Sequence, residues 1–296
     1  MIVAELGRFE PLPVFVAKPL TPSVVLQRIH WVASDKRQFV DVVDGSYVGP
    51  DRRFKFEGPP PGSEGRRETD LPVEPVPQEL DYDMWLGPAP KRPFNINRFH
   101  RTHYFNWDYC GGMTASWGIH LFDIVFWVMP PEVNRVSVSG GQYFYKHNID
   151  TPDTLEAVFD CPGYTMTYSL RQANGFPLRG EADHGIYFFG TEGTLFINRS
   201  RYEHYTEKDR KTPVIGENRG MDMQHKQKFL DSLKNRKITD SDVETGHLSG
   251  IPAHLANIAY RTGRSIQWDN QNQTIIGDPD AARYLSRAAR KPWDLI

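Results

Sequence analysis

The stretch WDYCGGMTASWGIHLFDIVFW, residues 107–127, carries the strongest structural signal in the sequence. Two glycines open it, and Pro130 and Pro131 follow it, so we expect a helix over about residues 115–129. One face of this helix is polar or aromatic, because such residues recur there at helical spacing: Ser116, His120, Asp123 and Trp127. The opposite face is apolar and should pack against a core: Leu121, Ile124, Val125 and Val128.

His120 and Asp123 lie one helical turn apart on the polar face, so their side chains can interact directly. A carboxylate in that position can fix the tautomer of an imidazole and raise its basicity. An imidazole held in this way can accept a proton from a ligand hydroxyl, which makes both residues candidate catalytic groups. The alternative is a structural pair where the helix meets a sheet, and spacing alone does not separate the two.

Aromatic residues gather just before the helix, in FHRTHYFNWDY, residues 99–109. They can form a platform for a ligand ring, or they can simply pack together. His100 and His103 also lie in this segment, but no matching carboxylate pattern follows them, so we predict no metal site. His184 precedes a predicted strand and lies either in a cleft or on the surface. The candidate substrate-binding residues are Tyr104, Trp107, Asp108, Ser116 and His184.

Alternating apolar and polar residues in the second half of the chain predict a sheet with one buried face. TLEAVFD and YTMTYSL, residues 154–160 and 164–170, should form a hairpin around the Pro162–Gly163 turn. Residues 186–190 and 194–198 predict a second hairpin.

Two helices are expected after these strands. Residues 223–237 place four apolar side chains towards one side: Met223, Phe229, Leu230 and Leu233. Residues 249–263 begin at Ser249, a good capping residue, and end at Gly263, which suits a left-handed cap. The expected fold class is therefore α+β, with a large, open, mainly antiparallel sheet and helices on one face.

The composition is that of a globular protein, with 296 residues, 39% hydrophobic and 24% charged, and a formal net charge of -2. No long basic stripe is present, which argues against nucleic acid as a partner. Cys110 and Cys161 form no CxxC pair, so neither a disulfide framework nor a zinc knuckle is expected. The sequence has neither a secretory signal nor an apolar stretch that could cross a bilayer, so we expect a cytoplasmic protein with no membrane partner.

Residues 58–93 are rich in proline and charge, so they cannot form a core of their own. We predict an extended arm that Trp85 and Leu86 anchor to a neighbouring surface, either of the same chain or of another subunit. We also expect a homo-oligomer, a dimer or a tetramer, in which apolar surface is covered.

Several segments resemble the C-terminal domain of the Gfo/Idh/MocA oxidoreductases, the family of glucose–fructose oxidoreductase and inositol dehydrogenase. They are residues 81–100, 106–127 and 150–175, followed in the same order by FGTEGTLFINR, KFLDSLKNRK and GHLSGIPAHLANIAYRTGRSIQWD. The resemblance covers about residues 54–296, which we interpret as the substrate domain, and leaves residues 1–53 as a short N-terminal segment.

This resemblance implies a large open sheet that carries the substrate site. Members mostly oxidise or reduce sugars, polyols and their derivatives with NAD or NADP, so a small carbohydrate or polyol is the implied ligand. His120 matches the family's active-site histidine, and Asp123 matches the acidic residue one turn later.

The sequence departs from the family pattern at its N-terminus and at the predicted site. The family's Rossmann domain carries a GxGxxG turn, and this sequence has none, so residues 1–53 are at most a remnant and the cofactor site is unknown. Ser116 stands where many members have Asp, and a hydroxyl cannot supply that charge. Lys18 precedes Pro19 as the family's active-site lysine does, but Ala17 replaces the glutamate, so Lys18 is either a remnant of that lysine or a chance match.

Three functions therefore remain open. The first is the substrate-binding half of a sugar or polyol oxidoreductase, with His120 as acid or base and Lys18 polarising the reacting oxygen. The second is a carbohydrate-binding or scaffold module without redox activity. The third is a lyase, epimerase or hydrolase that uses the same pocket without a cofactor.

Overall fold

A computed structural model describes residues 2–6, 39–41, 48–50, 73–145, 149–173, 183–217 and 221–294. The chain divides into two compact units. The first unit contains Met1–Leu12, Arg66–Arg219 and His247–Ile296, and the second contains Pro13–Gly65 and Gly220–Gly246. All described candidate site residues lie in the first unit.

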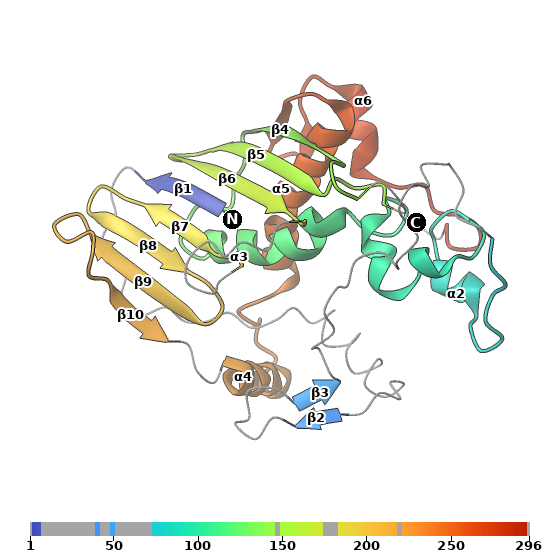
Figure 1. The fold of residues 1–296 in the computed structure, drawn as a ribbon, viewed down its shortest axis with the longest axis horizontal. Helices are drawn as coiled ribbons and strands as arrows, with labels where there is room; N and C mark the ends of the chain where they lie inside the picture. Colours follow the sequence, from blue (N-terminus) through green and yellow to red (C-terminus); the bar gives the residue numbers. More distant parts are fainter. Residues whose placement is uncertain are drawn as a thin grey trace. The chain divides into compact units, whose positions relative to one another are not determined.

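Ten strands of the described residues form one sheet in the first unit, in the order β10-β9-β8-β7-β1-β6-β5-β4-β11-β12 (Figure 1). Their bounds are β1 Ile2–Leu6, β4 Arg135–Gly141, β5 Thr154–Cys161, β6 Tyr164–Arg171, β7 Ile186–Phe189, β8 Gly193–Ile197, β9 Arg201–Thr206, β10 Val214–Glu217, β11 Ile266–Asp269 and β12 Thr274–Ile275. Only β1 and β7 pair in parallel, among the strands described, and this confirms the predicted, mainly antiparallel sheet. β1 comes from the N-terminal segment and lies between β6 and β7.

The hairpin of β5 and β6 confirms the predicted turn at Pro162–Gly163. Cys161 pairs with Tyr164 at the closed end, and Gly163 has a φ of +83°, which glycine adopts without steric cost. Every second residue of β5 is buried, and the residues between them are half-buried or exposed. The buried residues are Leu155, Ala157, Phe159 and Cys161. One face of this strand therefore belongs to the core, as the sequence pattern predicts. The second predicted hairpin is present as β7 and β8.

The helix after the glycine pair differs from the prediction in its first turn and at its end. The chain forms a π-helical turn, η3 (Thr114–Gly118), and then the α-helix α3 (Ile119–Phe126), in place of one α-helix over about 115–129. A π turn holds more residues than an α turn, and hydrophobic periodicity does not distinguish them over so short a stretch. Leu121 and Val125 are buried as predicted, and Phe122 joins them in the core with the strands.

The long helix α5 (Val243–Thr262) begins six residues before the predicted cap. Its first turn is capped by Asp242, whose Oδ1 accepts a 2.8 Å hydrogen bond from the Thr245 backbone N–H. Ser249 is therefore an interior residue of the helix, and its hydroxyl donates to another helix. The predicted end is confirmed, because Gly263 follows the helix with a φ of +65°.

The second unit contains the helix α4 (Met221–Asn235) and a small antiparallel pair, β2 (Phe39–Asp41) and β3 (Val48–Pro50). The helix predicted from residue 223 is thus present and begins slightly earlier. Three of its four predicted apolar residues are exposed: Met223, Leu230 and Leu233. Among the described helices, none is long and apolar enough to cross a membrane.

The predicted arm is anchored as expected in its described part. The short helix α2 (Tyr82–Leu86) is capped by Asp81, which accepts a 3.0 Å hydrogen bond from the Met84 backbone N–H. Leu86 is 3% exposed, and the Trp85 ring lies 5.1 Å from the rings of Phe99 and Tyr109. These contacts fix α2 against η2 (His100–Phe105) and the loop that leads to the glycine pair.

Candidate functional site

Gly111 and Gly112 hold the start of η3 against two buried side chains. The Asn257 amide of α5 donates a 2.8 Å hydrogen bond to the Gly111 carbonyl oxygen, and a Cβ at Gly111 would come within 2.5 Å of that amide nitrogen. Gly112 has a φ of +66°, and a Cβ there would lie 2.7 Å from Thr151 Cβ. The glycine pair of the sequence motif is therefore explained by close packing and by a left-handed backbone.

The π turn η3 displays the polar face that the sequence predicts. Ser116 is exposed, and Trp117 and His120 are half-buried, so the imidazole is not sealed inside the core. Tyr168 of β6 is 1% exposed and packs against Gly118. A Cβ added at Gly118 would lie 3.2 Å from the phenol oxygen of Tyr168. Burial raises the pKa of Tyr168, so this phenol stays protonated at neutral pH. π turns are rare and frequently occur at functional sites.

The Trp117 indole gathers three charged or ionisable side chains around it. The His120 ring lies 5.8 Å from the indole, and the His184 ring meets it edge-on at 5.0 Å. The Arg199 guanidinium lies 4.7 Å from the centre of the indole ring, a cation–π distance. We call these four residues the Trp117 cluster. It brings together two predicted site residues, His120 and His184, while Arg199 was missed because it follows β8 and carries no recognisable motif.

Asp123 connects α3 to α5. Its Oδ1 accepts a 2.8 Å hydrogen bond from the Ser249 hydroxyl, and its Oδ2 accepts a 3.2 Å hydrogen bond from Trp127 Nε1. The carboxylate thus has a structural role that the sequence did not predict. Its direct interaction with His120 stays a prediction.

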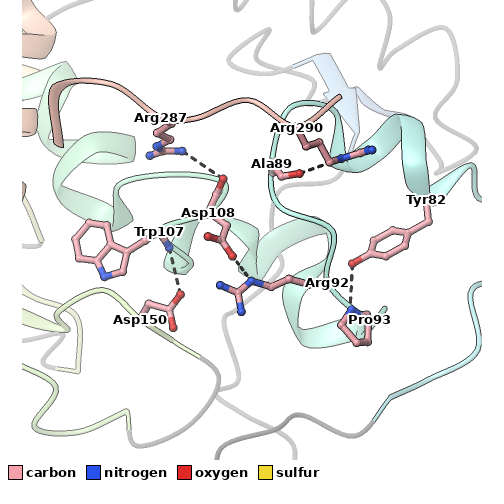
Figure 2. Close-up of polar contacts among 9 residues, drawn as sticks. All are labelled: Tyr82, Ala89, Arg92, Pro93, Trp107, Asp108, Asp150, Arg287 and Arg290. Carbon is pink, nitrogen blue, oxygen red and sulfur yellow. Dashed lines mark hydrogen bonds and ion pairs between the residues drawn. The ribbon is translucent and has the colours of Figure 1, made fainter. Parts of the chain in front are cut away.

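Trp107 and Asp108 belong to a second group of contacts, at the other end of the glycine motif (Figure 2). The Arg92 guanidinium forms an ion pair with the Asp108 carboxylate. The Trp107 backbone N–H donates a 3.3 Å hydrogen bond to Asp150 Oδ2. The Arg287 guanidinium donates to the Asp108 carbonyl oxygen over 3.3 Å, so the C-terminal segment reaches this loop.

The Trp107 side chain also lies against the end of α5. The Arg261 guanidinium is 4.9 Å from the centre of the Trp107 ring and 4.2 Å from that of Tyr284. The predicted substrate-binding residues are therefore not all brought together. His184 belongs to the Trp117 cluster and Ser116 lies next to it in the chain, whereas Trp107 and Asp108 lie in a separate segment that we call the Trp107 loop.

Two further candidates stand apart from both groups. The Tyr104 ring lies 4.4 Å from Phe105 and 5.6 Å from His103, which is ordinary aromatic packing within η2. Lys18 lies outside the residues that the structure describes. Within those residues, no group of three or more His, Cys, Asp or Glu side chains could hold a metal ion.

The fold is an α+β domain built on a large open sheet. A profile of the Gfo/Idh/MocA type, described as "Oxidoreductase family, C-terminal alpha/beta domain", matches residues 64–295. The chain therefore belongs to this oxidoreductase family and contains its C-terminal domain. No curated protein is significantly similar to it in sequence.

Several solved structures with detectable similarity are described as oxidoreductases or dehydrogenases. A putative oxidoreductase from Thermotoga maritima has a TM-score of 0.47 at 16% identity, over 57% of this chain and 51% of that chain. A putative myo-inositol dehydrogenase from Sinorhizobium meliloti 1021 has a TM-score of 0.41 at 15% identity, over 54% of this chain and 50% of that chain. The WlbA dehydrogenase from Bordetella pertussis, in complex with NADH and UDP-GlcNAcA, has a TM-score of 0.39 at 14% identity, over 57% of this chain and 49% of that chain. The matched region thus spans about half of each of these structures.

Proposed function

We propose that this chain is the substrate-binding half of a sugar or polyol oxidoreductase and that its ligand binds at the Trp117 cluster. The observation that supports this most directly is the arrangement of His120 and His184 around the Trp117 indole, next to the exposed Ser116. An aromatic ring suits the apolar face of a sugar ring, and imidazole, hydroxyl and guanidinium groups suit its hydroxyls.

In this proposal His120 moves the proton. One ring nitrogen of the neutral imidazole accepts the proton of a substrate hydroxyl, and the imidazolium returns it in the reverse direction. Arg199 and His184 orient the remaining hydroxyls, and Ser116 adds a neutral donor and acceptor. Asp123 holds α3 in place through Ser249, so its part in the reaction is to position His120.

The family implies a nicotinamide cofactor, and the residues of this chain do not fit one in the usual way. A dinucleotide site of this class needs a GxGxxG turn between a strand and a helix, and the sequence contains no pair of glycines with the GxG spacing. No step of the proposed mechanism therefore passes through the cofactor, and its site would have to lie on another domain or chain.

A second candidate is a carbohydrate-binding module without redox activity. It is favoured by the missing glycine-rich turn and by Ser116, which cannot supply the charge that an aspartate would place beside His120. In such a module the Trp117 cluster would bind a sugar and His120 would transfer no proton.

Calorimetry at two pH values separates the two candidates. The chain is titrated with D-glucose, myo-inositol, NAD and NADP at about pH 5 and at about pH 8, on either side of the usual histidine range. We expect sugar or polyol binding that is tighter at the higher pH, because only a neutral imidazole can accept the substrate's proton, and that is at least tenfold weaker in His120→Asn. His247→Asn serves as the matched control, because His247 lies exposed on α5 and bonds to Gln273 over 3.0 Å.

Sugar binding that is equally tight at both pH values and unchanged in His120→Asn would establish the module instead. If none of the sugars binds, both candidates fail. Saturable binding of NAD or NADP by the chain alone would contradict the absence of a conventional cofactor site.

We also propose that the chain forms a homo-oligomer. Val158 of β5 is 49% exposed and Phe189 of β7 is 38% exposed, so the sheet carries apolar side chains outside the core. Sedimentation velocity over a series of increasing protein concentrations is expected to show a dimer or a tetramer, and a monomer at every concentration would contradict this.

A further inference from the structure

The Arg261 guanidinium at the end of α5 is held by two aromatic rings. It lies 4.9 Å from the centre of the Trp107 ring and 4.2 Å from the centre of the Tyr284 ring. Contacts of this kind use the faces of the planar guanidinium and leave its N–H donors in the plane. Arg261 makes no hydrogen bond or ion pair with any residue that the structure describes. The rings therefore fix the position of a positive group whose donors face no protein acceptor there.

Arg287 brings a second positive charge to the same place. Its Nη1 donates to the Asp108 carbonyl oxygen and its Nη2 to the Cys110 carbonyl oxygen, each over 3.3 Å. Both partners are neutral, so within the described residues no carboxylate pairs with this guanidinium. Partial desolvation, and then the charge of Arg287, lower the pKa of Arg261, so the two guanidinium groups are near enough to repel each other.

The two carboxylates nearby do not cancel these charges. Asp108 forms an ion pair with Arg92, as Figure 2 shows. Asp150 accepts the Trp107 backbone N–H over 3.3 Å. Together, Arg92, Arg261, Arg287, Asp108 and Asp150 carry one net positive charge. Arg261 and Arg287 are exposed, so a ligand anion can reach them from solvent.

We propose that Arg261 and Arg287 form a binding site for the phosphate group of a small molecule, next to the Trp107 ring. The guanidinium fork matches the geometry of phosphate oxygens and binds them through paired, charge-assisted hydrogen bonds. Arg261 is already fixed by stacking, so binding orders fewer side-chain rotamers than a free arginine would require. Two sources share this chemistry, free phosphate and a phosphorylated sugar or nucleotide. This site is separate from the Trp117 cluster and does not depend on the function proposed there.

Isothermal titration at low ionic strength tests the site with three probes: inorganic phosphate, D-glucose 6-phosphate and uncharged D-glucose. We expect saturable binding of both phosphates, and we expect Arg261→Gln and Arg287→Gln each to weaken it about tenfold. Equal affinities for the two phosphates identify a free-phosphate site, and tighter binding of glucose 6-phosphate identifies a site for a phosphorylated ligand. Arg261→Lys keeps the charge and loses the fork, so it should give an intermediate affinity.

Arg264→Gln is the matched control, because it removes one positive charge three residues from Arg261. Arg264 already pairs with Asp278 over 3.0 Å, so its loss should change phosphate affinity less than twofold. The proposal is overturned if neither phosphate saturates the chain, or if Arg264→Gln weakens binding as much as Arg261→Gln does. His120→Asn should leave phosphate binding unchanged, so failure at the Trp117 cluster and failure here give different results.

Discussion

Replacing Ser249 with alanine should destabilise the fold, because it removes the hydrogen bond that joins α5 to α3. Ser249 is 2% exposed, and its hydroxyl donates to Asp123 Oδ1 over 2.8 Å. A hydrogen bond to a charged group contributes about 1.5–3 kcal/mol, and the hydrogen bond that Asp123 retains among the described residues is the 3.2 Å bond from Trp127 Nε1. We therefore expect the free energy of unfolding to fall by about 1.5–3 kcal/mol at pH 7.

Urea unfolding followed by circular dichroism measures this loss, and a double-mutant cycle with Asp123→Ala isolates the pair. The cycle should give a coupling energy of about 1–2 kcal/mol. Ser232→Ala on α4 is the control, since it repeats the gain in helix propensity without the bond to Asp123. A coupling energy below about 0.5 kcal/mol would refute the argument that this bond holds the two helices together.

Three further predictions concern the packing around the site. Gly112→Ala should lower the stability of the chain by at least about 1–2 kcal/mol more than Gly163→Ala, as measured by thermal unfolding. Both glycines have a positive φ, but a Cβ at Gly112 would clash with Thr151, whereas a Cβ at Gly163 would meet open space, so equal losses would contradict this. Desolvation by the neighbouring side chains lowers the pKa of His254 from 6.5, although the residue is partly exposed. The unfolded chain therefore binds the proton more readily, and the free energy of unfolding should fall as the pH drops below 6.5. His254→Gln should flatten that slope, and an unchanged slope would count against the argument. Burial raises the pKa of Cys161 to about 11, so its thiol is protonated and shielded in the folded chain. A thiol reagent at pH 8 should therefore modify the half-buried Cys110 first and Cys161 only after unfolding, and equal modification rates of the two cysteines in the folded chain would contradict this.

The sheet could be predicted from the sequence because its signals are local. Alternation along residues 154–170 and the Pro162–Gly163 turn determine both strands and their register without any distant contact. The buried side of α3 was equally predictable, since Leu121 and Val125 recur at helical spacing.

The remaining features depend on contacts that no local pattern reveals. Ser249 looks like a helix cap in the sequence, and its true role is set by Asp123, a residue on another helix. Gly118, the last residue of the π turn, packs against Tyr168, a strand residue fifty positions later. Arg199 joins the predicted site only because β8 ends beside Trp117, and chain order gives no sign of this contact.

Histidine NMR on the whole chain tests the proposed site most directly. The imidazole C–H signals of a histidine-labelled sample are followed while myo-inositol or D-glucose is added, with single His→Gln variants for assignment. We predict that His120 and His184 shift together and saturate at one affinity, because both rings contact Trp117, while His247 stays still. Saturable binding of either ligand that leaves His120 unmoved would contradict the account.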